Sequence, residues 1–188
     1  MLDVTRQYGP TLNDIRPDHV ARYEFAAQRL RGKRVLDLAC GCGYGSWILH
    51  EAGNDVTGVD ISEEAIEYAD RHYKGPAYAC QDASQTTGTY DALVTFETLE
   101  HLDDPGCILR MDAPLVIASV PNERNYPFRA GKFVNDKYPH KRHYTPEEFD
   151  ALLDGAGLRV TERFCQPTKQ GEIEEGTNGL FLIYIANR

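Results

Sequence analysis

The stretch that decides the fold is Val35-Leu36-Asp37-Leu38-Ala39-Cys40-Gly41-Cys42-Gly43-Tyr44-Gly45-Ser46. An apolar run with one acid ends in three glycines at alternate positions, and a helical pattern follows. Glycine suits a chain that leaves a buried strand in a sharp turn, and it lets a ligand touch the backbone. The order therefore predicts a strand, a ligand-binding loop and a helix.

A second acid follows 23 residues after Asp37, where the short apolar run 55–59 ends in Asp60. A carboxylate at this point accepts hydrogen bonds from both hydroxyls of a ribose in dinucleotide sites. The glycine spacing here is G-x-G-x-G, which is neither the dinucleotide pattern nor the phosphate-binding loop with its lysine. A carboxylate at Asp37 would repel a pyrophosphate and would suit a ligand that carries an ammonium and a sulfonium. The pattern therefore predicts S-adenosylmethionine as the cofactor.

Length and composition indicate one domain, residues 1–188, with a net charge of −9. This charge argues against a protein that coats duplex nucleic acid. No apolar run approaches the roughly 20 residues that cross a bilayer, and the first residues do not resemble a signal peptide. Five cysteines, an odd number with no C-x-x-C pair, fit reduced thiols. We therefore expect no membrane span and a cytoplasmic location.

Strand and helix patterns alternate along the chain, which predicts an α/β fold. We expect a single Rossmann-like sheet of seven strands, mostly parallel with the last strand antiparallel, and helices on both faces. Residues 1–31 form an N-terminal cap with a helix at 16–30, and residues 123–144 form a long loop on the acceptor side. The expected strands are 34–39, 55–59, 78–80, 90–96, 114–120, 158–165 and 180–186. The other expected helices are 44–51, 63–73, a short one from 97, and 145–154.

Five segments together resemble a bacterial and phage branch of the class I methyltransferases. They are Arg22-Tyr23-Glu24-Phe25-Ala26, Ala39 to Ser46, Phe96-Glu97-Thr98-Leu99-Glu100-His101-Leu102, Ser119-Val120-Pro121-Asn122 and Tyr144-Thr145-Pro146-Glu147-Glu148-Phe149. Two departures are visible. Ala39 replaces the first glycine of the family's loop, and Met111-Asp112-Ala113-Pro114 replaces a basic Pro-Gly-Gly turn, which shortens the preceding helix.

The resemblance implies a role for each cofactor-site residue. Asp60 would bind the ribose, Ile61 would lie against the adenine, and Asp82 would bind the adenine amino group with Ala83 beside it. Phe96 would lie near the sulfonium, and Arg22 would reach the methionine carboxylate. The methionine part would lie among Gly41, Gly43 and Gly45, and Asp37 and Ala39 of the same stretch are also expected to bind the cofactor. The alternatives are that Asp60 and Asp82 only cap turns and that Arg22 is a surface charge.

A second constellation, Glu97-x-x-Glu100-His101, places two carboxylates and an imidazole on one face of a helical turn. This donor set suits Mg²⁺ or Mn²⁺. It resembles the motif of metal-dependent small-RNA ribose methyltransferases and of ubiquinone-pathway O-methyltransferases. In the former a histidine precedes a Thr-led helix by five positions, and His140 stands five before Thr145 here. The alternative is that the carboxylates favour a helix N-terminus and that His101 packs or acts alone as a base.

The loop 123–144 is basic and aromatic in an otherwise acidic chain. Within 124–143 the single acid is Asp136, against the cations Arg124, Arg129, Lys132, Lys137, Lys141 and Arg142. The aromatic residues Tyr126, Phe128, Phe133, Tyr138 and Tyr144 are interspersed. Stacking combined with neutralisation of a phosphate or carboxylate is one use of such a mixture, and a solvated lid is the other.

These features predict an S-adenosylmethionine-dependent O-methyltransferase that acts on a hydroxyl of a small acceptor, such as a sugar of a glycan precursor. The catalytic residues would be His101, Glu97 and Glu100, with Glu97, Glu100, His101 and His140 as metal ligands. One alternative takes the end of a nucleic acid, or a nucleotide, as acceptor. Another is a non-catalytic module that only binds the cofactor. The sequence does not specify an oligomeric state.

Overall fold

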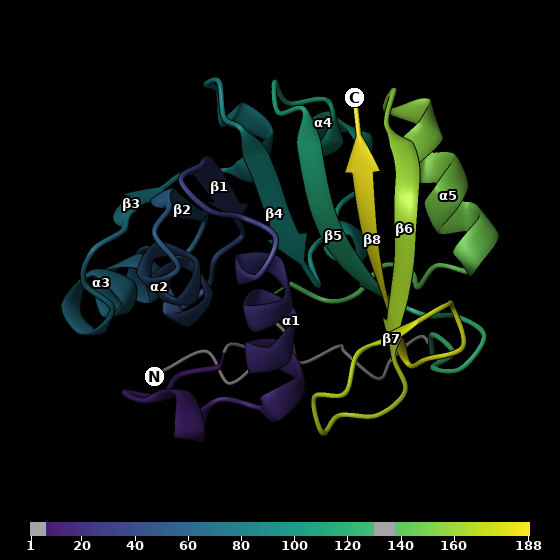
Figure 1. The fold of residues 1–188 in the computed structure, drawn as a ribbon, viewed down its shortest axis with the longest axis horizontal. Coiled ribbons are helices and arrows are strands. Elements are labelled where there is room, and N and C mark those ends of the chain that lie inside the picture. The colour runs from purple at the N-terminus through teal and green to yellow at the C-terminus, as the bar shows by residue number, and fades with distance from the viewer. Residues whose placement is uncertain (1–6, 130–137) are drawn as a thin grey trace.

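The computed structural model describes residues 7–129 and 138–188. In these residues eight strands form one sheet in the order β3-β2-β1-β4-β5-β8-β6-β7 (Figure 1). The strands are β1 (Arg34–Leu38), β2 (Asp55–Asp60), β3 (Ala77–Cys80), β4 (Ala92–Phe96), β5 (Leu115–Pro121), β6 (Arg159–Gln166), β7 (Glu174–Glu175) and β8 (Phe181–Asn187). The helices are α1 (Pro17–Ala27), α2 (Tyr44–Glu51), α3 (Glu63–His72), α4 (Gly106–Leu109) and α5 (Pro146–Gly155), with 3₁₀ turns at Leu12–Asp14, Ala83–Gln85 and Leu99–His101.

Two apolar cores lie on the two faces of the sheet, because alternate residues of a strand point to opposite faces. Leu36 and Leu38 of β1 face the core shared with α4 and α5. Val35 of the same strand faces the core shared with α1 and α2. The predicted α/β sheet with helices on both faces is confirmed.

Strands β1 to β5 pair in parallel, and β8 is antiparallel to both β5 and β6. The expected antiparallel last strand is therefore confirmed. The eighth strand, β7, consists of two exposed glutamates that pair with Phe164 and Cys165. Two polar residues carry no alternating pattern, so the sequence predicts a hairpin loop here and seven strands in the sheet.

Strand β1 has β2 on one side and β4 on the other, so the order of the strands reverses there. In open α/β sheets a ligand binds beyond the carboxyl ends of the strands at such a reversal. The glycine loop follows β1, Asp60 is the last residue of β2, and Glu97 follows β4. The fold thus brings the two predicted constellations to one edge of the sheet.

The short helix expected from Glu97 is wrong. Glu97 has a φ of 51°, which is left-handed backbone, and the 3₁₀ turn that follows begins at Leu99. The helical turn that does form before β5 is α4, with four residues. Its shortness agrees with the missing Pro-Gly-Gly turn.

The acceptor-side loop is described only in part. Residues 123–129 and 138–144 are anchored at both ends, because Glu123 donates its backbone N–H to the Tyr144 carbonyl and Tyr144 donates to the Pro121 carbonyl. The predictions for Lys132, Phe133, Asp136 and Lys137 fall outside the described residues. Within the described parts of the chain, none of the helices has the length and apolar character that a membrane crossing requires.

Candidate active site

A cavity of about 760 Å³ opens at the carboxyl ends of β1, β2 and β4. Its wall includes most of the residues predicted for the cofactor, which are Arg22, Ala39, Gly41, Asp60, Ile61, Asp82, Ala83 and Phe96. It also includes Glu97, His101 and His140 from the second constellation. Asp37, Gly43, Gly45 and Glu100 are not part of the wall. The cavity therefore unites the two constellations, with four of their members behind its surface.

The glycine loop owes its path to three residues in left-handed backbone. Gly41 and Gly43 have φ values of 55° and 86°, and Ala39 has a φ of 64°. A Cβ on Gly41 would meet no atom within 4 Å, whereas one on Gly43 would collide with Ala69. Only Gly41 thus presents open backbone to the cavity, and the role of Gly43 is to let the loop lie against α3.

We expect Ala39→Gly to stabilise the fold by about 1 kcal/mol, because Ala39 occupies backbone that costs an L-residue about this much. The free energy of unfolding in urea measures the gain. Ala151→Gly, on an exposed position of α5, is the matched control and should lose about 1 kcal/mol. Equal losses in both variants would show that the left-handed backbone at Ala39 carries no strain.

Asp60 ends β2 as a buried carboxylate in the cavity wall. Its Oδ2 accepts the Gly41 N–H at 2.9 Å, and its Oδ1 accepts the Ser62 N–H at 2.9 Å. Asp60 therefore caps a turn, which was the alternative role, and its bond to Gly41 also connects the glycine loop to β2. Each carboxylate oxygen has a second lone pair, so these bonds leave capacity for a hydroxyl donor.

Asp37 lies beneath the loop rather than in the wall. It is fully buried and accepts hydrogen bonds from Ser46 Oγ at 2.6 Å and Tyr23 Oη at 3.0 Å. Burial raises its pKa to about 7 despite these two bonds. The carboxyl therefore holds the first turn of α2 and the Tyr23 ring in place, and the expected position of Asp37 beside the ligand needs correction.

Gly45 also lies behind the wall. A Cβ there would sit within the Tyr23 ring, far closer than packed atoms approach. Tyr23 in turn packs edge-on against Phe96, with ring centroids 5.0 Å apart. Gly45 thus admits the ring that supports Phe96, which is a packing role rather than contact with a methionine tail.

The three residues expected around the adenine, Ile61, Asp82 and Ala83, all line the cavity. Ile61 is 48% exposed, which makes it the most exposed large apolar side chain among the described residues. Asp82 accepts the Ser84 N–H at 2.8 Å and Ser84 Oγ at 2.7 Å, and these bonds lower its pKa. Asp82 therefore caps a 3₁₀ turn while it remains in the wall.

Arg22 is not a surface charge, because its side chain is only 1% exposed. Its Nη1 donates to Gln166 Oε1 at 2.6 Å and lies 4.0 Å from Glu97 Oε1. Its Nη2 lies 3.7 Å from Asp18 Oδ2. Nη2 makes no hydrogen bond within the described residues. A buried guanidinium with an unused donor in a cavity wall is suited to an anion.

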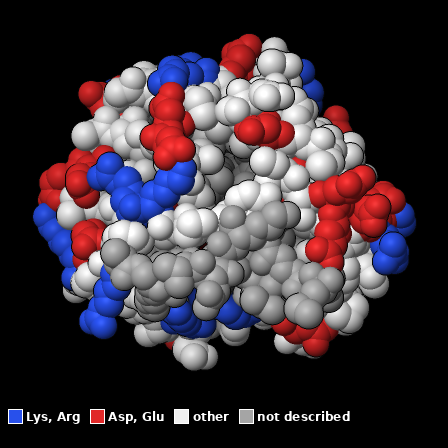
Figure 2. Space-filling model, turned by 180° about the vertical axis from the view of Figure 1, so that it is seen from behind, with Lys and Arg blue, Asp and Glu red and all other residues white. Residues whose placement is uncertain are grey.

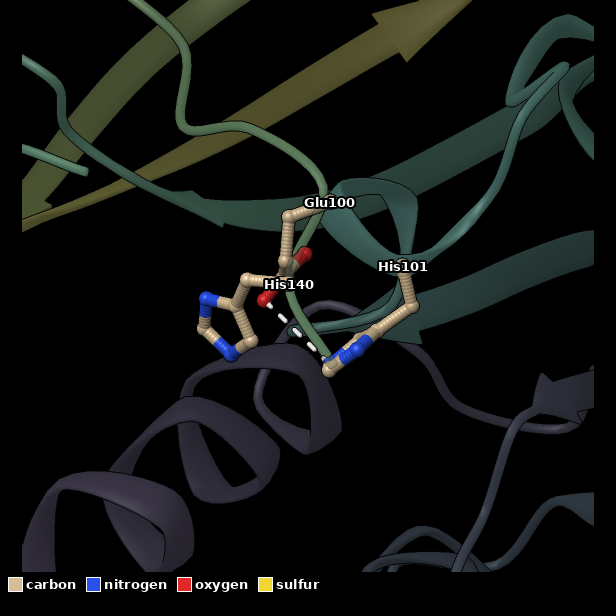
Figure 3. A group of neighbouring side chains, drawn as sticks. All are labelled: Glu100, His101 and His140. Carbon is tan, nitrogen blue, oxygen red and sulfur yellow. Dashed lines mark ion pairs between the residues drawn. The ribbon is translucent and has the colours of Figure 1, made fainter. Parts of the chain in front are cut away.

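The second constellation is smaller than the sequence predicted. Possible ligand atoms of Glu100, His101 and His140 all lie within 4.8 Å of one another, and Figure 3 shows the three side chains converging. Glu97 does not join this group. Its left-handed backbone directs the carboxylate to Ser119, whose Oγ donates to Oε1 at 2.8 Å.

Glu100 is fully buried, and neither carboxylate oxygen has a hydrogen-bond partner in the described structure. Burial first and the Glu97 carboxylate second raise its pKa well above the ordinary value. Burial raises the pKa of Glu97 as well. Burial of this kind favours the protonated form of a carboxyl, and a positive charge brought to it favours the carboxylate.

A hydrogen-bond chain orients the His140 ring. The Tyr126 carbonyl lies 2.6 Å from His143 Nδ1, and His143 Nε2 lies 2.9 Å from His140 Nδ1. A carbonyl only accepts, so in neutral rings His143 donates from Nδ1 and accepts at Nε2 from His140. His140 then carries its lone pair on Nε2.

Four residues that sequence reasoning did not assign support this site, namely Tyr23, Ser46, Gln166 and His143. Tyr23 and Ser46 lie within the motifs quoted from the sequence, but the sequence does not indicate that both donate hydrogen bonds to Asp37. Gln166 and His143 gave no signal, because their bonds depend on segments far apart in the chain.

Three features together are typical of S-adenosylmethionine-dependent methyltransferases. They are the reversal of strand order at β1, the glycine loop that follows β1, and Asp60, which accepts a hydrogen bond from that loop. The family profile described as "Methyltransferase domain" matches residues 16–163. The chain belongs to this family and is a methyltransferase.

Named relatives and solved structures agree with this assignment. A ubiquinone biosynthesis O-methyltransferase of Aeromonas salmonicida is 30% identical over 85% of this chain and 76% of that protein. The Bordetella avium protein of the same name is 34% identical over 56% of this chain, and the match covers only 47% of its own length. A Synechocystis magnesium protoporphyrin IX methyltransferase with bound S-adenosylhomocysteine (SAH) has the same fold, with a TM-score of 0.64 and 23% identity over 91% of this chain and 81% of that one.

Proposed function

We propose that this methyltransferase transfers the methyl group of S-adenosylmethionine to a hydroxyl oxygen of a small acceptor. The observation that carries the proposal is one cavity lined both by the glycine loop with Asp60 and by His101 and His140. In the reaction the hydroxyl oxygen attacks the methyl carbon, a carbon–oxygen bond forms and the carbon–sulfur bond breaks. The sulfonium becomes a neutral thioether, and the hydroxyl proton must be accepted by the protein.

His101 is the group that we assign to this proton. It lies in the wall, and its Nε2 is 4.0 Å from Glu100 Oε1. An imidazole so placed serves as a general base, and Glu100 behind it restricts the ring. Glu97, in strained backbone at the end of β4, is a positioning residue that links Ser119 to the cavity.

Calorimetry with SAH tests the cofactor assignment, and we expect micromolar binding. A screen for SAH release across sugars, nucleotides and phenols then tests the transfer. Absence of binding by both SAH and S-adenosylmethionine would overturn the proposal. Binding without turnover of any acceptor would favour the non-catalytic cofactor-binding module.

The acceptor is proposed by chemical class. A sugar hydroxyl of a glycan precursor remains the proposal from the sequence, and the comparisons give it no support. The name shared by the Aeromonas and Bordetella relatives favours a second candidate, a ring hydroxyl of an aromatic acceptor. Tyr126, Tyr138 and Phe181 in the cavity wall suit stacking against either kind of ring.

A nucleic-acid end or a nucleotide is the remaining acceptor alternative. Outside the grey area of Figure 2, acidic and basic side chains alternate on that face rather than forming one basic surface. Together with the net charge of −9, this favours a small acceptor over a long duplex.

The cytoplasmic location also stays a prediction.

A divalent metal is proposed as an additional component. The donor set fits one, because the orphaned carboxylate of Glu100 lies beside His101 and His140. Two imidazoles with one carboxylate suit Mn²⁺ better than Mg²⁺, since Mg²⁺ prefers oxygen ligands. Glu97, also predicted as a ligand, would have to leave Ser119 to join them. When bound, the ion would take the His101 imidazole as a ligand and would lower the pKa of an acceptor hydroxyl, which would replace the role of His101 as a free base.

We expect EDTA to reduce turnover by about tenfold or more and Mn²⁺ to restore it, in line with the weight of such an ion in catalysis. Electron paramagnetic resonance of free Mn²⁺ should also show one binding site that Glu100→Gln abolishes. Glu51→Gln, at the exposed end of α2, is the control and should keep the site. Full activity in EDTA with no bound Mn²⁺ would remove the metal from the proposal.

A further inference from the structure

One corner of the cavity carries more positive charge than its surroundings can neutralise. Arg16, His19 and Arg22 reach it from the start of α1, and Lys169 reaches it from the segment after β6. The two segments are packed together, because Gln166 Nε2 donates to the Asp18 carbonyl at 3.0 Å. The corner is therefore a built part of the cavity wall.

Two acids lie within these contacts, Asp18 and Glu97, whose Oε1 is 4.0 Å from Arg22 Nη1. Asp18 is already engaged. Its two oxygens accept hydrogen bonds from the Arg16 guanidinium, and Arg22 Nη2 lies 3.7 Å away. Lys169 has no ion pair with any of the described residues, and its Nζ lies 5.3 Å from the centre of the Tyr126 ring. Three cations, Arg16, Arg22 and Lys169, thus face two carboxyl groups, Asp18 and Glu97, and burial raises the pKa of Glu97. A positive excess therefore remains at this corner of a protein whose net charge is −9.

His19 reports the same excess charge. Its Nδ1 lies 3.0 Å from Tyr44 Oη. Burial, and then the charges of Arg22, Arg16 and Lys169, lower its pKa well below the usual value. His19 is therefore neutral at physiological pH, so it can donate a hydrogen bond to an anion without adding to the repulsion among the cations.

The position of Lys169 connects this corner with the acceptor side. The Tyr126 ring beneath its ammonium lies 6.1 Å from the Phe181 ring, and both line the cavity. The Tyr126 carbonyl begins the hydrogen-bond chain through His143 to His140. A group held at Lys169 would therefore lie close to the elements that orient the catalytic cluster.

We propose that Arg16, His19 and Lys169 form a subsite for a carboxylate or phosphate group of the acceptor. The acceptor class would then be hydroxylated acids or phosphate monoesters. This inference rests on the proposed function, in which Arg22 is left to the methionine carboxylate. The same chemistry could instead serve only that carboxylate, and the experiment separates the two sources.

The test is calorimetric titration of inorganic phosphate into the protein saturated with SAH, after binding of SAH has been measured on the same sample. We expect phosphate to bind this complex and Lys169→Gln to weaken the binding about tenfold, the size of one lost charge-assisted contact. Lys74→Gln, an exposed lysine after α3, is the matched control and should leave phosphate affinity unchanged.

Phosphate that binds the free protein but not the SAH complex would overturn the inference, because the corner would then belong to the methyl donor. Equal phosphate affinity in wild type and Lys169→Gln would also overturn it. If SAH itself fails to bind, the proposed function fails separately. The phosphate titration of the free protein and of Lys169→Gln then still decides whether the corner binds an anion.

Discussion

Replacement of His101 by alanine should lower turnover by about 10²–10⁴-fold, the usual weight of a positioned general base. Affinity for SAH should change by no more than about threefold, because the loss falls on the reacting oxygen rather than on the bound nucleoside. The geometry places the effect at this residue. Glu100 lies behind the wall, whereas His101 lies in it, on the segment that follows β4.

The measurement is kcat from SAH release, with calorimetric SAH affinity on the same preparation. His72→Ala is the matched control, since His72 is an exposed histidine at the end of α3. Partial recovery of turnover on addition of free imidazole would show that the missing group accepts a proton. A kcat near that of the wild type would remove His101 from the chemistry.

The fold could be read from the sequence because its signals are local and repeated. Apolar runs with alternating helical segments marked seven strands, and Ser62 and Thr145 marked helix starts that the structure contains. The boundaries shifted by one to three residues at several ends, as for the helix expected at 16–30 and found at Pro17–Ala27. Strand β7 was not predicted, because its two glutamates form a strand only by pairing with Phe164 and Cys165 of β6.

The site was predicted less completely, for two physical reasons. A left-handed backbone at a residue other than glycine leaves no mark in the sequence, so the path at Glu97 and the strain at Ala39 were invisible. Burial also depends on distant partners. Arg22 is enclosed because Gln166, 144 positions along the chain, meets it from β6.

Gly45 is a second residue whose surroundings depend on a distant partner. Its position in the motif predicts a ligand contact, whereas the structure shows a packing contact with Tyr23. Its helical backbone would favour alanine, which raises helix stability by up to about 1 kcal/mol over glycine. The Tyr23 ring opposes this gain, since it occupies the space of the new Cβ. We expect Gly45→Ala to lose about 3 kcal/mol, the upper part of the range for overpacked cores.

Gly155→Ala provides a control with the opposite sign. Gly155 is the last residue of α5, and a Cβ there would meet no atom within 4 Å. This variant should be neutral or gain up to about 1 kcal/mol in urea unfolding. The same substitution in helical backbone would thus stabilise or destabilise according to the space beside it.

The damage at Gly45 should also reach the cofactor. Displacement of Tyr23 breaks its bond to Asp37 and withdraws the ring that packs on Phe96 in the cavity wall. SAH affinity should therefore fall with stability, and Tyr23→Ala combined with Gly45→Ala should cost less than the sum of the two single losses, with a coupling of about 1–3 kcal/mol. Strict additivity in this cycle would mean that the ring and the glycine do not share the space beneath the loop, and the account of Gly45 would fail.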